Sequence, residues 1–545
     1  MTEFNLIGVL AAVADAVSDR EALVHRNQRW TFRQLIDRSA SVGGFLSAQG
    51  LGCHRERAGL AGHEKGQDAV ALLLHNHPAY LEAMLGCFAA RTAPFNVNHR
   101  YVAEELEYVV ADAGARAIVF DGQLAPNVAE IRRSLPDDVV LIQVEDDSGA
   151  DLLPGAEWYS VVAQHPPAAI DDCSPDDLYM LYTGGTTGQP KGVLWRQADF
   201  FVGALGGFNR GEDREFESYD ELAERARTGT PSRWLTAAPF MHGAAQWIAL
   251  QAFSLGHTVV LSDEPTRFDP TSVLDTIGRE RVANLQIVGD AFARPLLHAM
   301  TTEDADLSSL KMLISGGAPL SAGLKQTFSD TFPGLLIRDS IGSSETGVQG
   351  RNDTRPDGTA STGVFEPSRG ALVVAADFGR VLEPGDPEIG WFGMVGRVPL
   401  GYLGDAEKTE RTFPVIDGER IAVPGDRAQW LEDGRIDVLG RDSVTINSGG
   451  EKIFAEEVEA ALKVNPAVWD VIVCGRPSER WGSEVVALVH LHAGATVTDD
   501  ELVSACEGHL ARYKWPKLVI RVDEVRRSPS GKPDYGWAKE IAAAH

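Results

Sequence analysis

Glycine, threonine and lysine gather in residues 183–192, a segment whose composition suits a bound anion. Glycines let the backbone approach closely, so that bare N–H groups, threonine hydroxyls and a lysine ammonium can converge on phosphate oxygens. The apolar run 178–182 precedes the segment, which places it where a predicted strand gives way to a turn. It differs from a Walker loop, in which Gly-Lys-Ser/Thr opens a helix. We predict a nucleotide-phosphate loop, against the alternative of a flexible surface loop; its candidate ligands are Thr183, Gly184, Gly185, Thr186, Thr187, Gly188 and Lys191.

A second candidate contact is the carboxylate of Glu345, in the segment 339–347 that follows a predicted buried strand. In α/β proteins, ligand contacts lie at the carboxyl ends of the strands. Glu345 can hold Mg²⁺ against a triphosphate, because this ion takes oxygen ligands. The segment 315–319 closes another predicted strand, and its small residues would let a flat base lie against the backbone. Taken alone, each segment is more simply a surface turn.

Four further residues are weaker candidates. Asp426 and Arg441 each follow a glycine and place an acid and a base where ribose hydroxyls could bind, although Asp426 alone is typical of a turn. His242 lies beside an aromatic side chain and a methionine, as in a substrate pocket. A core histidine whose ring nitrogens are hydrogen-bonded within the protein is an equal alternative. Lys532 lies on a stiff, turn-prone loop, where a lysine by itself is an ordinary surface residue.

The elements that must position these residues alternate between strand and helix from about residue 255 to 345. Buried strands are predicted at 258–261, 282–288, 310–314 and 335–338, with helices near 270–281, 290–300 and 321–331. A similar mixture, with a helix at 79–89 and a strand at 117–120, occupies the first 150 residues. This alternation is typical of layered α/β domains with parallel strands.

The chain of 545 residues is too long for one ordinary domain. Residues 208–233 are acidic, and we expect a solvated insertion there. Residues 365–441 are rich in glycine, proline and short apolar runs, which predicts a β-rich subdomain. We therefore expect an α/β fold: a large N-terminal domain, 1–441, of layered α/β subdomains plus this β-rich one, and a small α+β domain, 442–545.

Composition narrows the class of protein. A net charge of −28 argues against broad nucleic-acid binding, so a polyanion must be met by local positive clusters. Five scattered cysteines without CxxC spacing predict reduced thiols and a cytoplasmic location. Neither a basic signal region nor an apolar run of membrane-spanning length occurs, so no integral membrane association is expected.

The order of the motifs is more informative than any one of them. Along the chain stand TGGTTGQPKG (183–192), PFMHG (239–243), SGGAP (315–319), IGSSETG (341–347), GYLGD (401–405), PGD (424–426), GRDSVTINSGGEKI (440–453) and SGK (530–532). Over nearly its whole length the chain thereby resembles the adenylate-forming superfamily of acyl-CoA synthetases, luciferases and adenylation domains. The stretches at 289–295, 448–459 and 526–539 look most like actinobacterial fatty-acyl and steroid side-chain CoA ligases.

The resemblance implies a reaction in two halves. A carboxylate attacks the α-phosphorus of ATP, pyrophosphate leaves, and the thiol of CoA then displaces AMP from the acyl-adenylate. Residues 183–191 would wrap the β- and γ-phosphates, and Lys532 would bridge the substrate carboxylate and phosphate oxygens. The remaining nucleotide contacts implied are Glu345 to Mg²⁺, Ser344 near the α-phosphate, Gly317, Ala318 and Pro319 beside adenine, and Asp426 and Arg441 on ribose.

The second half-reaction would follow a rotation of the small C-terminal domain. The CoA contacts implied are Gly449 and Gly450 in the pantetheine tunnel and Trp481, Tyr513 and Lys517 on the nucleotide, with Trp515 as either a contact or a structural residue. The acyl pocket is expected to draw on His242, Trp247 and Gly289, together with Trp195, Phe200, Phe201 and Gln246.

Two departures from the family pattern concern adenine and the hinge: Ile341 stands where relatives often carry an aromatic, and Ser443 where they carry Asp or Lys. Neither removes a reacting group. We therefore predict an ATP- and Mg²⁺-dependent ligase that joins CoA to a medium- or long-chain fatty acid or a steroid side-chain acid, with a homodimer left open. The alternatives are an enzyme that loads the acyl group onto a carrier protein or leaves it as acyl-AMP, and a catalytically inactive binding protein.

Overall fold

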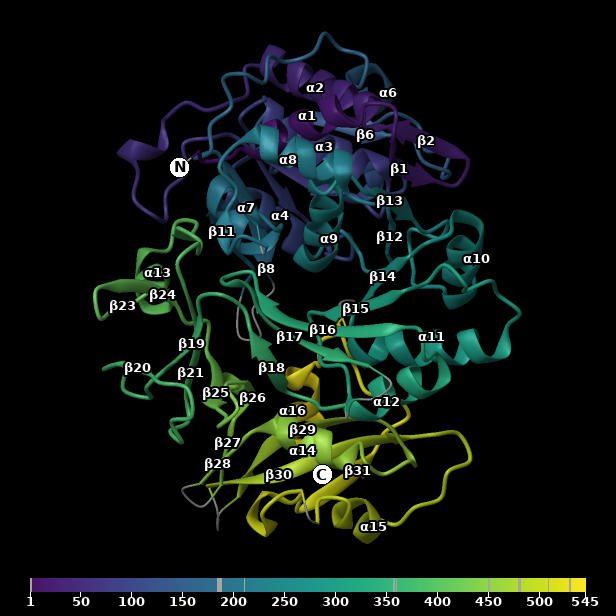
Figure 1. The fold of residues 1–545 in the computed structure, drawn as a ribbon, viewed down its shortest axis with the longest axis vertical. Coiled ribbons are helices and arrows are strands. Elements are labelled where there is room, and N and C mark those ends of the chain that lie inside the picture. The colour runs from purple at the N-terminus through teal and green to yellow at the C-terminus, as the bar shows by residue number, and fades with distance from the viewer. Residues whose placement is uncertain are drawn as a thin grey trace.

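The computed structural model describes residues 2–183, 189–209, 211–355, 358, 360–448, 451–478, 482–507, 509–528 and 531–545. Its main sheet is centred on parallel strands from the middle of the chain (Figure 1). In spatial order these are β13 (Thr258–Leu261), β12 (Arg233–Thr236), β14 (Asn284–Ile287), β15 (Met312–Gly316) and β16 (Leu336–Ser343). Every residue of β13 and β14 is buried, as parallel strands covered on both faces require.

The helices α10 (Pro270–Glu280), α11 (Gly289–Thr302) and α12 (Ala322–Thr331) alternate with these strands along the chain. The predicted alternation is confirmed, although the last strand is longer than expected and continues to Ser343. Because β14, β15 and β16 are parallel, their carboxyl ends meet at one edge of the sheet. Gly289, Gly317 and Ser344 follow these strand ends closely, so one edge collects three of the predicted segments.

A second sheet is formed by the N-terminal part of the chain. It consists of the parallel strands β4 (Ala93–Asn96), β3 (Ala69–Leu73), β5 (Ala115–Asp121), β6 (Val140–Val144) and β7 (Ala156–Trp158). Helix α3 (Pro78–Ala89) is buried along its whole length and packs on α2 (Phe32–Ala48). The expected helix at 79–89 and strand at 117–120 are both present.

The glycine-rich segment joins two antiparallel strands, β8 (Leu178–Thr183) and β9 (Lys191–Arg196). The short strand β22 (Gly401–Tyr402) pairs with β9, so that Tyr402 lies opposite Val193. The GYLGD motif is thereby brought beside the glycine-rich segment, although more than 200 residues separate them in the chain. Gly184, Gly185, Thr186, Thr187 and Gly188 lie outside the described residues.

Beyond β16 the main sheet becomes antiparallel and enters the β-rich region, which includes β17 (Gly347–Thr354), β18 (Val364–Pro367), β21 (Gly390–Val395), β25 (Asp426–Trp430) and β26 (Ile436–Arg441). The chain then forms a separate sheet of β29 (Val468–Ser478), β30 (Gly482–Leu491) and β31 (Leu518–Arg521), packed with α14 (Ala455–Leu462) and α16 (Tyr535–Ala544). This unit has hydrophobic cores of its own and lies at the bottom of Figure 1. The expected α/β class, with a large N-terminal part and a small C-terminal part, is confirmed.

The acidic stretch 208–233 differs from the prediction of a solvated insertion. It contains the helix α8 (Tyr219–Thr228), which packs on α1 (Leu6–Ala16). Leu222 and Ala226 are fully buried, and Phe216 is 5% exposed. The acidic side chains cover the outer face of an amphipathic helix. Within the described ranges, no helix is long and apolar enough to cross a membrane.

Candidate active site

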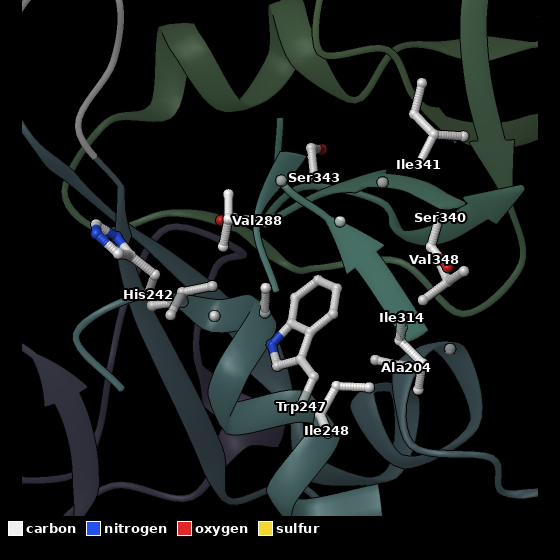
Figure 2. Close-up of a pocket in the computed structure, with 18 of the residues that line it drawn as sticks. Ala204, His242, Trp247, Ile248, Val288, Ile314, Ser340, Ile341, Ser343 and Val348 are labelled. Carbon is white, nitrogen blue, oxygen red and sulfur yellow. The ribbon is translucent and has the colours of Figure 1, made fainter. Parts of the chain in front are cut away.

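A cavity of about 1400 Å³ lies at the carboxyl edge of the main sheet. Figure 2 shows His242 and Trp247 on one side of it and Ser340, Ile341 and Ser343 of β16 on the other. These residues come from segments that are distant in the chain, and the C-terminal loop reaches the same space. Six of the predicted site residues line it: Thr183, His242, Trp247, Gly317, Ser344 and Lys532.

Lys532 reaches the cavity from a tight turn of the C-terminal loop. The Ser528 N–H donates to the Lys532 carbonyl at 2.8 Å, and the Gly531 N–H donates to the Ser528 carbonyl at 2.8 Å. Burial lowers the pKa of Lys532, the Arg441 charge lowers it further, and Glu345 and Asp426 oppose these effects. The four charged groups are therefore within electrostatic reach of one another. Because Lys532 lines the cavity, its ammonium is placed to stabilise negative charge that develops on a bound ligand.

Asp426 and Arg441 are directly opposite each other on the neighbouring strands β25 and β26. Arg441 Nε lies 3.3 Å from Asp426 Oδ1, and this carboxylate is the main cause that raises the pKa of Arg441. The two predicted ribose contacts, 15 residues apart in the chain, thus form one ion pair near Lys532. The ion pair places a carboxylate acceptor beside a guanidinium donor, a combination suited to binding the two hydroxyls of a diol.

Glu345 is held by the hydroxyl of Tyr402, which donates to Oε1 at 2.7 Å. The neighbouring Ser344 is fixed through its carbonyl, which accepts a hydrogen bond from Trp195 Nε1 at 2.8 Å. The described residues contain no cluster of three or more His, Cys, Asp or Glu side chains able to hold a metal ion. A single carboxylate is nevertheless enough for Mg²⁺, which commonly takes one or two carboxylates plus phosphate oxygens. Glu345 therefore fits this ion.

Gly289 does not line the cavity, in contrast to the acyl-pocket prediction. It has a φ of +51°, and a Cβ at this position would lie 2.6 Å from the Pro319 carbonyl oxygen. Gly289 therefore supports the loop that contains Gly317, Ala318 and Pro319, and the preceding Val288 lines the cavity instead. Whether Gly289 or the preceding Val288 faces the cavity depends on the direction of the backbone at this point, which the sequence does not reveal.

The apolar side of the cavity includes Trp247 and Ile248 of α9 (Gly243–Ser254), together with Ala204, Ile314 and Val348 (Figure 2). The Trp247 Nε1 donates to the Tyr179 hydroxyl at 3.2 Å, which fixes the ring. Burial lowers the pKa of His242 to about 4, so this imidazole is neutral at physiological pH. Its Nε2 has no hydrogen-bond partner in the described part of the chain. This nitrogen is therefore buried and, among the described residues, unpartnered beside the cavity.

Four other residues expected in the acyl pocket lie behind its wall. Phe200 stacks on Tyr179 with 4.1 Å between ring centroids, and Gln246 accepts from the Tyr179 hydroxyl at 2.6 Å. All four are at most 1% exposed and none lines the cavity: Trp195, Phe200, Phe201 and Gln246. They belong to the core that supports Trp247. Hydrophobic composition indicated that these residues are buried, but not which of them reach the surface of the cavity.

Of the residues expected to bind CoA, the described Tyr513 and Lys517 do not line the cavity. Tyr513 is 44% exposed on the short helix η4 (Arg512–Lys514), and Lys517 precedes β31. Trp515 packs on the C-terminal core and donates from Nε1 to the Leu510 carbonyl at 3.0 Å, which favours its structural interpretation. Gly449, Gly450 and Trp481 lie outside the described residues.

Two contacts near the site escaped the sequence reasoning. Tyr402, which holds Glu345, is part of the GYLGD motif, but only the β9–β22 pairing shows what it contacts. Lys325 on α12 is completely buried, with Nζ 2.7 Å from Asp339 Oδ2 on β16. No local pattern marks either contact.

Comparisons with known proteins identify the family of the chain. The family model "AMP-binding enzyme" matches residues 10–392, and "AMP-binding enzyme C-terminal domain" matches 457–532. The medium-chain acyl-CoA ligase Mig of Mycobacterium avium is 50% identical, covering 99% of this chain and 98% of its own. A 3-oxocholest-4-en-26-oate–CoA ligase of Rhodococcus rhodochrous is 37% identical, covering 98% and 95%.

The solved structures agree as well. ATP-bound MatB from Rhodopseudomonas palustris has a TM-score of 0.81 and 25% identity, and 99% of each chain is covered. The resemblance to an adenylate-forming fatty-acyl or steroid side-chain CoA ligase, drawn from the order of the motifs, is thus confirmed over the full length. The chain belongs to the family of AMP-binding enzymes.

Proposed function

We propose that this protein is an ATP-dependent acyl-CoA ligase that activates a medium- or long-chain fatty acid or a steroid side-chain carboxylate through an acyl-adenylate. The observation that carries the proposal is the cavity, in which an apolar side formed by Trp247 and Ile248 meets the ammonium of Lys532. An amphipathic acid fits this combination, with its chain on the apolar side and its carboxylate toward the cation. The similarity to a medium-chain acyl-CoA ligase, 50% identical over 99% of this chain, supports the same reaction.

In the first half-reaction the acid and the α-phosphate of ATP must approach each other although both are negative. Lys532 would lie between them and stabilise the charge that builds on the phosphate oxygens. Asp426 and Arg441 would hold the ribose, and Gly317 would let adenine lie against the backbone, since a φ of +90° and the missing side chain leave that face open. Binding the nucleotide at three places restricts the α-phosphate to one position, which is the entropic part of the catalysis.

Mg²⁺ would be held by Glu345, oriented by the Tyr402 hydroxyl. When it is bound, the ion neutralises part of the negative charge of the phosphates. Lys191, at the start of β9, would add a positive charge beside the phosphates; its Nζ is 3.6 Å from Asp112 Oδ1. This ion pair is partly exposed, so it can exchange for a phosphate at little cost.

The second half-reaction requires the thiol of CoA to reach the acyl-adenylate. We propose that residues 442–545 form a mobile domain that rotates about the segment near Ser443, withdraws Lys532 and brings in Gly449 and Gly450. The separation of Tyr513 and Lys517 from the cavity supports a second orientation. The presence of Lys532 at the cavity supports assigning this orientation of the small domain to the first half-reaction. A cytoplasmic location and a homodimer remain predictions.

The test is a mass-spectrometric assay of purified protein with ATP, Mg²⁺, CoA and a panel of acids from butyrate to oleate, including a cholesterol-derived side-chain acid. The proposal predicts acyl-CoA and AMP in equal amounts, with a preference for acids that have long apolar chains. Acyl-AMP accumulating without thioester would contradict it and would favour a carrier-loading enzyme. Absence of AMP with every acid would favour an inactive binding protein.

A further inference from the structure

A chain of buried charges joins the large and small parts of the molecule close to the cavity. Lys463, at the end of α14, lies between two carboxylates: its Nζ is 3.1 Å from Asp290 Oδ2 and 3.6 Å from Asp470 Oδ1. Asp290 belongs to α11 of the large part, whereas Asp470 belongs to β29 of the small part. The side chains of Lys463 and Asp290 are 11% and 7% exposed. A contact this well buried cannot be exchanged for water without a cost.

On the small part, the chain of charges leads to the loop of Lys532. Arg527 donates to both oxygens of Asp470, from Nε at 2.6 Å and from Nη2 at 2.7 Å. Its Nη1 donates to the Gly531 carbonyl at 3.0 Å, next to Lys532. A Cβ placed on Gly531 would lie 3.5 Å from the Ala291 Cβ, so the loop rests on the first turn of α11. The position of Lys532 therefore depends on this contact surface.

On the large part, the same chain leads to the loop proposed to hold adenine. The Ser321 N–H donates to Asp290 Oδ1 at 2.7 Å, and the Asp290 N–H donates to the Pro319 carbonyl at 3.1 Å. The Asp290 carboxylate thus accepts from the loop 317–321 with one oxygen and from Lys463 with the other. The Lys463 and Arg294 charges outweigh the opposing effect of burial and keep the pKa of Asp290 below its ordinary value, so it remains ionised.

We propose that Lys463 is a positioning residue for adenylation. By bridging Asp290 and Asp470, it holds the Lys532 loop against the loop 317–321, which is proposed to contact adenine. This inference rests on the proposed function, including the rotation of the small domain. Lys463 and Asp290 are on opposite sides of the rotating boundary, so the bridge exists in one orientation only. It stabilises the adenylation arrangement and must open before CoA can react. Lys463 touches neither substrate nor reacting atoms in this account.

The experiment measures the two half-reactions separately in full-length Lys463→Met, Lys463→Arg and Asp290→Asn variants. Adenylation is followed by acid-dependent exchange of labelled pyrophosphate into ATP, and thioester formation by adding CoA to synthetic acyl-AMP. Lys539→Met, an exposed lysine on α16 of the same small domain, is the matched control. We expect Lys463→Met and Asp290→Asn to lower adenylation by about 10- to 100-fold, the scale of a misplacement of about 1 Å.

Thioester formation from supplied acyl-AMP should stay within about twofold of the wild-type rate, and Lys463→Arg should recover most of the adenylation rate, because it keeps the charge. Equal losses in both half-reactions would overturn the inference, since a merely structural residue would produce them. Unchanged adenylation in Lys463→Met would overturn it as well. If the wild-type protein itself forms no AMP with any acid, the proposed function fails instead, which is a different result.

Discussion

Replacing Lys325 by methionine should destabilise β16, the strand that leads to Ser344 and Glu345, and the effect should depend on pH. The Lys325 ammonium is completely buried, 2.7 Å from Asp339 Oδ2, and it also donates to the Ser361 carbonyl at 2.8 Å. Removing one partner of a buried pair costs about 3–5 kcal/mol, because the other charge is left without compensation. We therefore expect the free energy of unfolding to fall by about that amount at pH 8.

The pH dependence follows from Asp339. Burial raises the pKa of its carboxyl from 3.8 to about 6 although Lys325 opposes this, so the loss of Lys325 should raise it further. A carboxyl whose pKa is higher in the folded state stabilises less and less as the pH rises through that pKa. Near pH 5 the group is protonated in both proteins, and the difference between them should shrink.

Urea unfolding followed by tryptophan fluorescence at about pH 5 and pH 8 measures this difference. The double variant Lys325→Met/Asp339→Asn is the control, because it removes both charges and should recover at least half of the loss. A Lys325→Met protein within about 1 kcal/mol of the wild type at both pH values would refute the reasoning. So would a deficit that grows on acidification.

Three other results are expected. Lys532→Ala should lower adenylation by about 10²–10³-fold, the scale of one lost preorganised contact, while thioester formation from supplied acyl-AMP is spared; equal damage to both steps would reject its assigned role. Gly289→Ala should lower the melting temperature and raise the KM for ATP, because its Cβ would lie 2.6 Å from the Pro319 carbonyl at a positive φ, whereas Gly323→Ala, with open space around it, should do neither. Burial raises the pKa of Glu456 to about 8 from an ordinary 4.5, so its carboxyl keeps a proton in the folded state and its penalty grows as the pH rises between these values. Melting curves of Glu456→Gln should show an advantage over the wild type that increases from pH 5 to pH 9, and a constant difference would contradict this.

The alternation of strands and helices between about residues 255 and 345 was predictable because β13, β14 and β15 are short apolar runs, each with a helix after it. The strand β12 of the same sheet was not predicted. The β9 strand was missed, since Lys191 and Gly192 resemble the end of the loop more than the start of a strand. For the acidic stretch 208–233 a signal existed. Leu222 and Ala226 are four residues apart, the spacing of one buried helical face, but seven nearby acidic residues dominated the composition.

Within the site, residue type was predictable and orientation was not. Asp426 and Arg441 were identified separately, whereas their pairing depends on the register of β25 and β26. Trp195 was expected in the cavity and lies behind it, because hydrophobicity is the same for a residue that lines a pocket and for one that supports it. The bridge from Asp290 to Lys463 joins residues 173 positions apart, beyond the reach of any local pattern.

The most direct test of the acyl-adenylate account uses a medium-chain fatty acid labelled with ¹⁸O in both carboxylate oxygens, incubated with the enzyme, ATP, Mg²⁺ and CoA. If the carboxylate attacks the α-phosphorus and CoA then displaces AMP, one labelled oxygen must remain on AMP, and the acyl-CoA must carry the other. Mass spectrometry of the AMP should therefore show one ¹⁸O in every molecule formed. Unlabelled AMP, or label in pyrophosphate or inorganic phosphate, would contradict the central claim.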